Sequence, residues 1–205
     1  MEFKDSNTGQ YNTYNETRQG EGSQYINNVG QVTYNYAAPS RMDAYFRRLH
    51  IEIINNITCE IIEDLRDYKT QLYGAIGLEQ KLIDGGFTQG NIKWALSKAA
   101  QYNKKAIKYE CYPSAQEINL LLFGEIKSKF DHYIFPDIKK GVGVDTALQR
   151  IDAIIVSPIM QMLNANGEHD EDLHYTSDHI YGMMFYLIDM SQICWKDYEP
   201  LAKIL

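Results

Sequence analysis

Apolar residues recur every three or four positions from Met42 onward, which is the spacing of one face of an α-helix. The first series predicts one unbroken amphipathic helix from Met42 to Leu72, about 45 Å long at 1.5 Å per residue. Its apolar positions are Met42, Tyr45, Phe46, Leu49, Ile53, Ile57, Ile61, Leu65, Tyr68 and Leu72. No strand pattern interrupts this series.

Two further helices are expected before residue 110. The stretch GLEQKL predicts a short helix that stops at Gly85-Gly86, because glycine is favoured just beyond a helix C-terminus. Asn91 is then a candidate cap for a third helix. The inner face of that helix would carry Ile92, Leu96, Ala99 and Ala106.

Prolines divide the remainder of the chain. Pro113-Ser114 opens a fourth helix, which we expect to end at Pro136 because proline cannot continue the α-helical hydrogen bonds. A fifth series begins near Val144, with a kink or a helix junction expected at Pro158. A sixth helix begins near Ser177. Because no strand alternates with these helices, residues 39–205 read as an all-α, multi-helix bundle.

The first 38 residues follow a different pattern. Asn, Tyr, Gly, Gln, Thr and Ser supply 25 of residues 1–36, so this segment has too few aliphatic side chains to fold alone. It contains a loose repeat, GQYNTYN at 9–15 and GQVTYNY at 30–36. Two interpretations stand: a disordered tail, or polar strands that pair with the same strands of sister subunits.

The second interpretation predicts a homo-oligomer. Tyrosine, valine and threonine favour strands, and strands shared between identical subunits cover one another's open edges. We therefore expect an N-terminal polar β-strand or extended segment that is used in oligomerisation. The residues expected to carry it are Tyr11, Tyr14, Tyr25, Val29, Val32, Tyr34 and Tyr36.

Charge and composition exclude some functions. The formal net charge of −7 disfavours nucleic acid as a direct ligand, because phosphate binding needs a basic face and the densest basic runs are only pairs such as Lys104-Lys105. No apolar run is long enough to cross a membrane, and the N-terminus has no signal-peptide pattern. The three cysteines form no CxxC pair. These features predict a cytoplasmic protein.

One segment has metal-binding chemistry. GEHDEDLHYTSDH, residues 167–179, gathers imidazole and carboxylate groups, which are ligands of divalent metals. The candidate ligands are His169, Asp170, Asp172, His174 and His179. The alternative is an exposed acidic loop before a helix capped by Ser177 or Asp178. Because the spacing matches no known ligand signature, we favour the loop and keep a metal-dependent, nuclease-like hydrolase as the alternative function.

Other enzyme signatures are missing from the sequence. GGFTQGNIK lacks the terminal Gly-Lys-Ser/Thr of a phosphate-binding loop, and there is no GxSxG elbow. We therefore expect no cofactor and no catalytic residues. Another alternative is an acidic helical regulator that binds the basic surface of another protein.

Two passages resemble a known family. KYECYPSAQEINLLLFGEIKSKFDHYIFPDI at 108–138 and SDHIYGMMFYLIDMSQICW at 177–195 are similar to the C-terminal domains of bacterial ABC-three-component conflict systems. The matching positions are Tyr112, Pro113, Ser114, Ala115, Gln116, Glu117, Ile118, His179, Gly182, Met183, Tyr186, Leu187 and Trp195. The resemblance covers about residues 40–200, but no effector domain precedes them in this sequence.

The resemblance implies a non-catalytic module that couples proteins in anti-phage or anti-plasmid defence. Its implied partners are an ABC-type ATPase and a small middle-component protein. The residues expected to dock a partner are Tyr112, Gln116, Glu117, His179, Gly182 and Trp195. Gly182 stands within a predicted helix, where glycine indicates close approach of a neighbouring helix or of a partner.

Overall fold

The computed structural model describes residues 22–26, 32–36, 40–70 and 76–196. The chain divides into two units, residues 1–40 and 41–205. In the first unit, β1 (Gly22–Ile26) pairs antiparallel with β2 (Val32–Tyr36), with Gly22 opposite Tyr36 and Ile26 opposite Val32. Tyr11, Tyr14 and Val29 lie outside the described residues. The use of this segment in oligomerisation stays a prediction.

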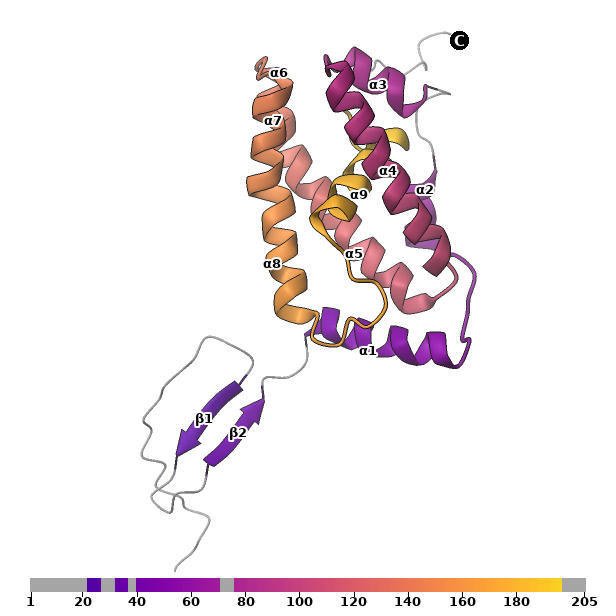
Figure 1. Ribbon diagram of the computed structural model, residues 1–205, viewed down its shortest axis with the longest axis vertical. Coiled ribbons are helices and arrows are strands. Elements are labelled where there is room, and N and C mark those ends of the chain that lie inside the picture. Colours follow the sequence, from indigo (N-terminus) through magenta and orange to yellow (C-terminus); the bar gives the residue numbers. More distant parts are fainter. Residues whose placement is uncertain (1–21, 27–31, 37–39, 71–75, 197–205) are drawn as a thin grey trace, which may run out of the picture. The chain divides into compact units, whose positions relative to one another are not determined.

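The second unit is built from helices, as the apolar periodicity predicts (Figure 1). The single helix expected from Met42 to Leu72 is wrong, because α1 (Arg41–Ile54) ends at an Asn-Asn pair. Asn56 adopts a φ of 51°, and the Ile57 N–H donates to the Glu52 carbonyl at 2.8 Å. This left-handed C-terminal cap suits asparagine better than most residues. The chain then runs irregularly to α2 (Glu63–Lys69).

The short helix α3 (Leu78–Asp84) confirms the prediction from GLEQKL. Gly86 has a φ of 80° and ends it, as glycine does at this position. The next helix, α4 (Gln89–Tyr109), begins earlier than predicted. Its cap is Thr88, whose hydroxyl accepts the Asn91 N–H at 3.2 Å, and Asn91 itself lies inside the first turn.

Pro136 does not end the fourth helix. In the structure α5 (Pro113–Lys129) continues through a π-helical turn, η1 (Phe130–Ile134), into α6 (Phe135–Lys139). The Phe135 N–H bonds to the Phe130 carbonyl, five residues back. Such a wide turn accommodates a proline that can neither donate a hydrogen bond nor fit against an ordinary α-helical turn.

The same arrangement recurs at Pro158. Here α7 (Val144–Ile151) passes through η2 (Asp152–Val156) into α8 (Ser157–Asn166). The Ser157 N–H bonds to the Asp152 carbonyl, again five residues back. The junction predicted at this proline is therefore confirmed, and its form is a π-helical turn.

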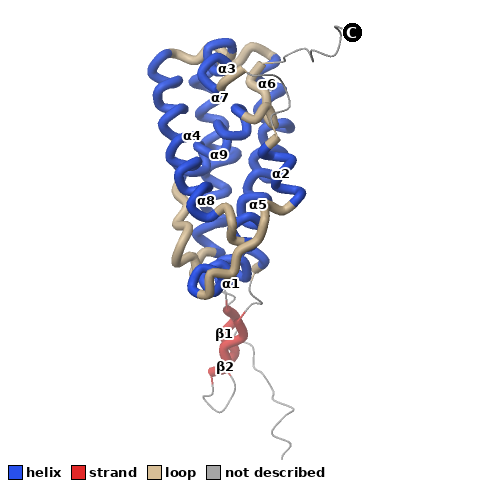
Figure 2. The backbone as a smooth tube through the Cα atoms, turned by 90° about the vertical axis from the view of Figure 1, so that its right-hand side faces the viewer, coloured by secondary structure: helices blue, strands red, loops and turns tan. Residues whose placement is uncertain are grey.

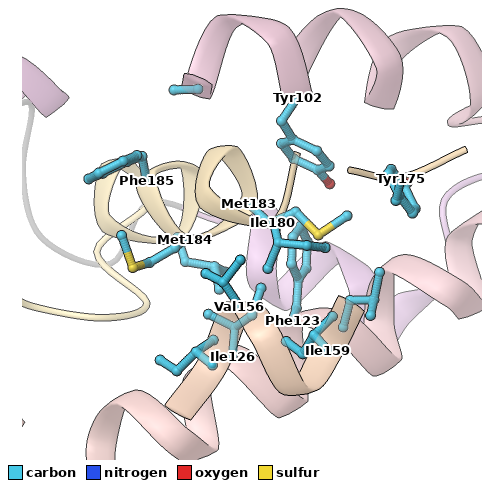
Figure 3. Close-up of a cluster of buried hydrophobic side chains, with 14 of the residues drawn as sticks. Tyr102, Phe123, Ile126, Val156, Ile159, Tyr175, Ile180, Met183, Met184 and Phe185 are labelled. Carbon is cyan, nitrogen blue, oxygen red and sulfur yellow. The ribbon is translucent and has the colours of Figure 1, made fainter. Parts of the chain in front are cut away.

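The last helix, α9 (Ser177–Asp189), lies among the others in both views (Figures 1 and 2). It packs mainly against α4 and also contacts α3, α5 and α8. Figure 3 shows Met183, Met184 and Phe185 of α9 within a cluster of buried apolar side chains that includes Phe123 of α5. Within the described residues, no helix is both long enough and apolar enough to span a membrane.

Candidate functional site

The buried Gln116 joins α5 to the irregular segment before α2. Its Oε1 accepts the Ile62 N–H at 2.7 Å, and its Nε2 donates to the Glu110 and Glu60 carbonyls at 2.7 and 3.1 Å. The amide nitrogen also lies 3.4 Å from Cys59 Sγ, so both ends of the buried amide are engaged within the fold. Gln116 thus holds the chain path and presents no atom for docking.

Other residues of the YPSAQEI stretch join α5 to α1. The buried carboxylate of Glu52 accepts the Ser114 N–H at 2.9 Å and the Ser114 hydroxyl at 2.6 Å, so a side chain of α1 caps the N-terminus of α5. The Tyr45 hydroxyl donates to Glu117 at 3.3 Å. Glu117 and Tyr112 are both half-buried.

The three predicted docking residues of the C-terminal region also make internal contacts. A Cβ at Gly182 would lie 2.3 Å from the Lys98 carbonyl oxygen, so α4 and α9 meet there backbone to backbone. Trp195 is buried and packs edge-on against Phe87, with ring centroids 4.5 Å apart. His179, half-buried, accepts the Thr176 backbone N–H through Nδ1 at 3.1 Å. The cap of α9 is therefore Thr176, not Ser177 or Asp178.

The His/Asp segment before α9 is held by contacts of its own. His169 Nδ1 lies 2.7 Å from Asp43, and Asp170 accepts the Leu173 and His174 N–H groups, each at 2.8 Å. Burial raises the pKa of Asp43, but hydrogen bonds from His169 and Arg47 outweigh it and bring the pKa below its ordinary value. The five proposed metal ligands thus point to different partners.

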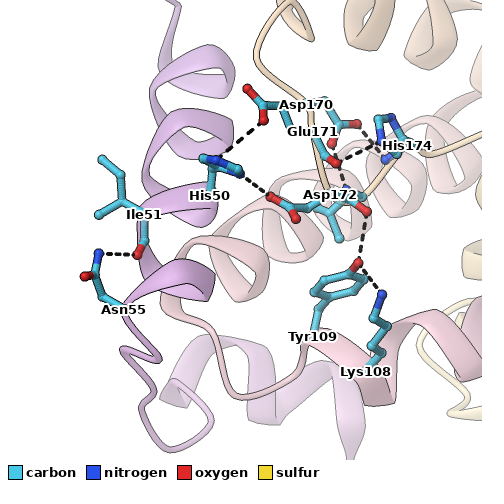
Figure 4. Close-up of polar contacts among 10 residues, drawn as sticks. His50, Ile51, Asn55, Lys108, Tyr109, Asp170, Glu171, Asp172 and His174 are labelled. Atoms are coloured by element: carbon cyan, nitrogen blue, oxygen red, sulfur yellow. Dashed lines mark hydrogen bonds and ion pairs between the residues drawn. The ribbon is translucent and has the colours of Figure 1, made fainter.

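Figure 4 shows the part of this segment that faces α1. His50 Nδ1 lies 3.2 Å from Asp172, and His174 Nε2 lies 3.0 Å from the Glu171 carbonyl. Across the residues that the structure describes, no three His, Cys, Asp or Glu side chains are grouped as metal ligands would be. The geometry gives the metal-centre hypothesis no support and favours an ordered acidic loop.

A groove lies between this loop and α4, with a volume of about 700 Å³. From α4 its lining residues are Gln101, Lys104, Lys105, Lys108 and Tyr109. From the facing segment they are Asp172, Leu173, His174, Thr176, Asp178 and His179. The volume is that of ordinary ligand and peptide pockets. This groove is the candidate functional site.

Lysines of α4 line one wall of the groove, across from Asp172 and Asp178. The helix contains five lysines and no acidic residue, although the whole chain has a formal charge of −7. Two of these lysines secure the facing segment. The Lys105 ammonium donates to the Leu173 and His174 carbonyls, and Lys98 pairs with Asp178 at 2.7 Å.

The other two lysines of the groove face solvent. Lys108 donates to the Tyr109 hydroxyl at 2.8 Å, which raises the pKa of Lys108, and Tyr109 in turn donates to the Asp172 carbonyl at 3.0 Å. Lys104 is exposed and makes no hydrogen bond or ion pair with another described residue. Burial, by contrast, lowers the pKa of Lys105. The groove therefore offers two accessible cations beside a preformed wall.

Comparison with known families matches one domain family across both walls of this groove. Residues 77–195 match C-terminal domain 9 of the ABC-three component (ABC-3C) systems. The chain belongs to this family. The match confirms the resemblance that the two quoted passages carry, and it begins just before α3 and ends at Trp195. Comparison with curated proteins and with solved structures found no match.

Within the CTD9 region, the residues that carry the resemblance are chiefly packing residues. Gln116, Gly182 and Trp195 are buried, whereas Lys104 and Lys108 of the groove are exposed. A signal for the groove was nevertheless present, since Gln101, Lys104, Lys105 and Lys108 follow the spacing of one helix face. The facing segment has no comparable signal, because its position depends on tertiary contacts.

Proposed function

We propose that this chain is a non-catalytic coupling module of a bacterial ABC-three component defence system. Its helical unit would dock partner proteins, and its N-terminal strands would associate with those of other copies. The partners implied are an ABC-type ATPase and a small middle-component protein. The observation that carries this proposal is the family match over residues 77–195, which includes every residue that lines the groove.

The contacts of the polar side chains favour docking over catalysis. His169, Asp170 and His179 each hold another part of the fold, through Asp43, the Leu173 N–H and the Thr176 N–H respectively. A general base or a metal ligand needs a lone pair directed at substrate or metal. The groove, in contrast, exposes the ammonium groups of Lys104 and Lys108.

Co-purification tests the coupling function. The full chain, tagged and co-expressed with the ATPase and the middle component of the same system, should elute with at least one of them in size-exclusion chromatography. The expected complex has a defined stoichiometry by light scattering. Separate elution of all three proteins, at concentrations of tens of micromolar, would contradict the proposal.

Mass in solution tests the assembly function. The full chain should have an oligomeric mass, and a chain without residues 1–38 should have a lower one. A full-length Thr33→Pro variant should also have a lower mass than the wild type. Proline removes a backbone N–H from β2 without shortening the chain. Equal, monomeric masses for the full chain and both variants would refute self-assembly.

A further inference from the structure

The exposed face of α4 combines charge with an apolar side chain. Lys104, Ile107 and Lys108 stand three and four residues apart, so they share one face of the helix. The Ile107 side chain is 68% exposed. Ile107 does not line the groove, but as the neighbour of Lys108 it offers a partner an apolar contact beside the two exposed ammonium groups.

We propose that the α4 groove binds an acidic segment of a partner protein, with carboxylates on Lys104 and Lys108 and, outside the groove lining, an apolar side chain against the exposed Ile107. This inference rests on the proposed coupling function and names the chemistry of its ligand. Charge complementarity carries it, because α4 is the part of an otherwise acidic chain with five lysines and no carboxylate.

The groove is built before any ligand arrives. Lys105 is bonded to the carbonyls of residues 173 and 174, and Tyr109 is bonded to the carbonyl of residue 172, so the wall opposite α4 is already fixed. A preformed site avoids the cost of ordering its own loop on binding. Its volume of about 700 Å³ suits a few residues of an extended or helical segment.

The opposite wall favours a peptide over nucleic acid. Asp172 and Asp178 line the groove across from the lysines, and Glu171 is exposed next to them. A phosphodiester backbone carries a negative charge at every nucleotide and would meet these carboxylates along its length. A peptide can place its acidic residues toward α4 and neutral or basic residues toward Asp172 and Asp178.

A charge-reversal variant tests the inference. Lys104→Glu/Lys108→Glu should retain the wild-type circular dichroism, because both side chains are exposed, and should lose only a few degrees of melting temperature with the hydrogen bond from Lys108 to Tyr109. The matched control is Lys93→Glu/Lys140→Glu, which changes the charge equally at exposed positions outside the groove. Binding is measured on an array of overlapping 15-residue peptides that covers the ATPase and the middle component, followed by fluorescence anisotropy of labelled peptides.

We expect at least one acidic peptide to bind the wild type and the control with equal affinity, and the charge-reversal variant at least tenfold more weakly. The affinity of the wild type for this peptide should also fall as the salt concentration is raised from 50 to 300 mM. The inference would be overturned if acidic peptides bound the wild type, the control and the charge-reversal variant equally well. It would also be overturned if the wild type preferred basic peptides. A single-stranded oligonucleotide that binds the groove more tightly than any peptide would likewise overturn the inference, since it would assign the site to nucleic acid.

Failure of this inference is distinguishable from failure of the coupling function. If the charge-reversal variant co-purifies with the partners as fully as the wild type, coupling stands and the groove is not its site. If the wild type itself elutes alone, coupling fails. In that case an acidic peptide that binds the groove would belong to a different partner.

Discussion

The contact between α4 and α9 and the attachment of α1 to α5 hold the helical unit together by different means. At Gly182 the backbones of α4 and α9 approach so closely that a Cβ would lie 2.6 Å from the Tyr102 Cβ. At α5, by contrast, buried polar side chains accept backbone N–H groups: Glu52 of α1 accepts the Ser114 N–H, and Gln116 of α5 accepts the Ile62 N–H of the segment before α2. The contact of α4 with α9 depends on the absence of a side chain at residue 182. The contacts of α5 depend on each buried polar group having a hydrogen-bond partner.

The two regions also differ in their relation to the family. Helices α4 and α9 both lie within residues 77–195, whereas α1 and the segment before α2 precede them. Gln116 and Ser114 stand inside the match, but their partners, Ile62 and Glu52, stand outside it. The polar contacts therefore join the family domain to a flanking element. Substitutions at each region test whether this difference has energetic consequences.

The largest effect is expected at the close contact of α4 and α9. Gly182→Ala should lower the free energy of unfolding by about 2–3 kcal/mol, because the added methyl group has to push the Lys98 carbonyl away. Urea denaturation followed by circular dichroism measures the change. The control is Gly90→Ala in α4, where a Cβ meets only Thr88 Oγ1 at 3.9 Å and alanine favours the helix.

Unchanged stability in Gly182→Ala would show that α4 and α9 can separate without loss. Close backbone contact at Gly182 would then not be what holds α4 to α9. Destabilisation by Gly90→Ala of the same size would instead point to a general sensitivity of α4 to substitution.

A slightly smaller effect is expected where α5 meets the irregular segment. Gln116→Leu leaves the Ile62 N–H and the Glu110 carbonyl without their partner, which should cost about 2 kcal/mol. Gln149→Leu, at an exposed glutamine of α7, is the control and should change stability by less than about 0.5 kcal/mol. If the two variants are equally stable, the hydrogen bonds of Gln116 contribute nothing that leucine packing does not replace.

The carboxylate cap of α5 should give a coupling energy of about 1–1.5 kcal/mol. The measurement is a double-mutant cycle with Glu52→Ala, Ser114→Ala and the combined variant, since the two residues share hydrogen bonds at 2.6 and 2.9 Å. Ser114→Ala retains the backbone N–H, so part of the interaction survives in that variant. Additive effects within about 0.3 kcal/mol would mean that the cap adds no stability of its own.

The sequence predicted the helical fold well where a local pattern decides the structure. GLEQKL gave α3 with its glycine cap, and the Pro158 junction was expected. The predictions were wrong where the same residues are compatible both with the end of a helix and with its continuation. Asn55-Asn56 lies in an apolar series that continues to Leu65, and only the φ of Asn56 shows that the helix ends. The helix continues past Pro136 because a π-helical turn precedes it, and no residue of FDHYI predicts that turn from the sequence.

The candidate site was less predictable for a related reason. Half of the groove, the lysine face of α4, is visible as a helical spacing in the sequence. The other half depends on contacts between distant residues, such as His50 with Asp172 and Tyr109 with the Asp172 carbonyl. The same contacts explain why a segment rich in metal-ligand residue types forms a loop, since its side chains pair with α1 and with the local backbone.

The smallest expected effect is a pH dependence at the start of α9, beside the close contact with α4. Burial, helped by the nearby Lys105 and Lys98 cations and opposed by Asp178, lowers the pKa of His179 below 6.5. The neutral ring is the form that caps the helix, because Nδ1 accepts the Thr176 N–H. In the unfolded chain the histidine regains its ordinary pKa of about 6.5.

Between these two pKa values the unfolded state binds more protons than the folded state, so stability rises with pH through this window. Acidification from pH 7.5 to 5.5 should therefore weaken the cap, by no more than about 1 kcal/mol, as is typical of capping interactions. His179→Gln is the decisive variant, because glutamine at this position can bond the same N–H without titrating. The variant retains the other four histidines of the chain, so the difference between variant and wild type isolates His179. A difference in unfolding free energy that stays constant from pH 7.5 to 5.5 would show that protonation of His179 does not weaken the start of α9.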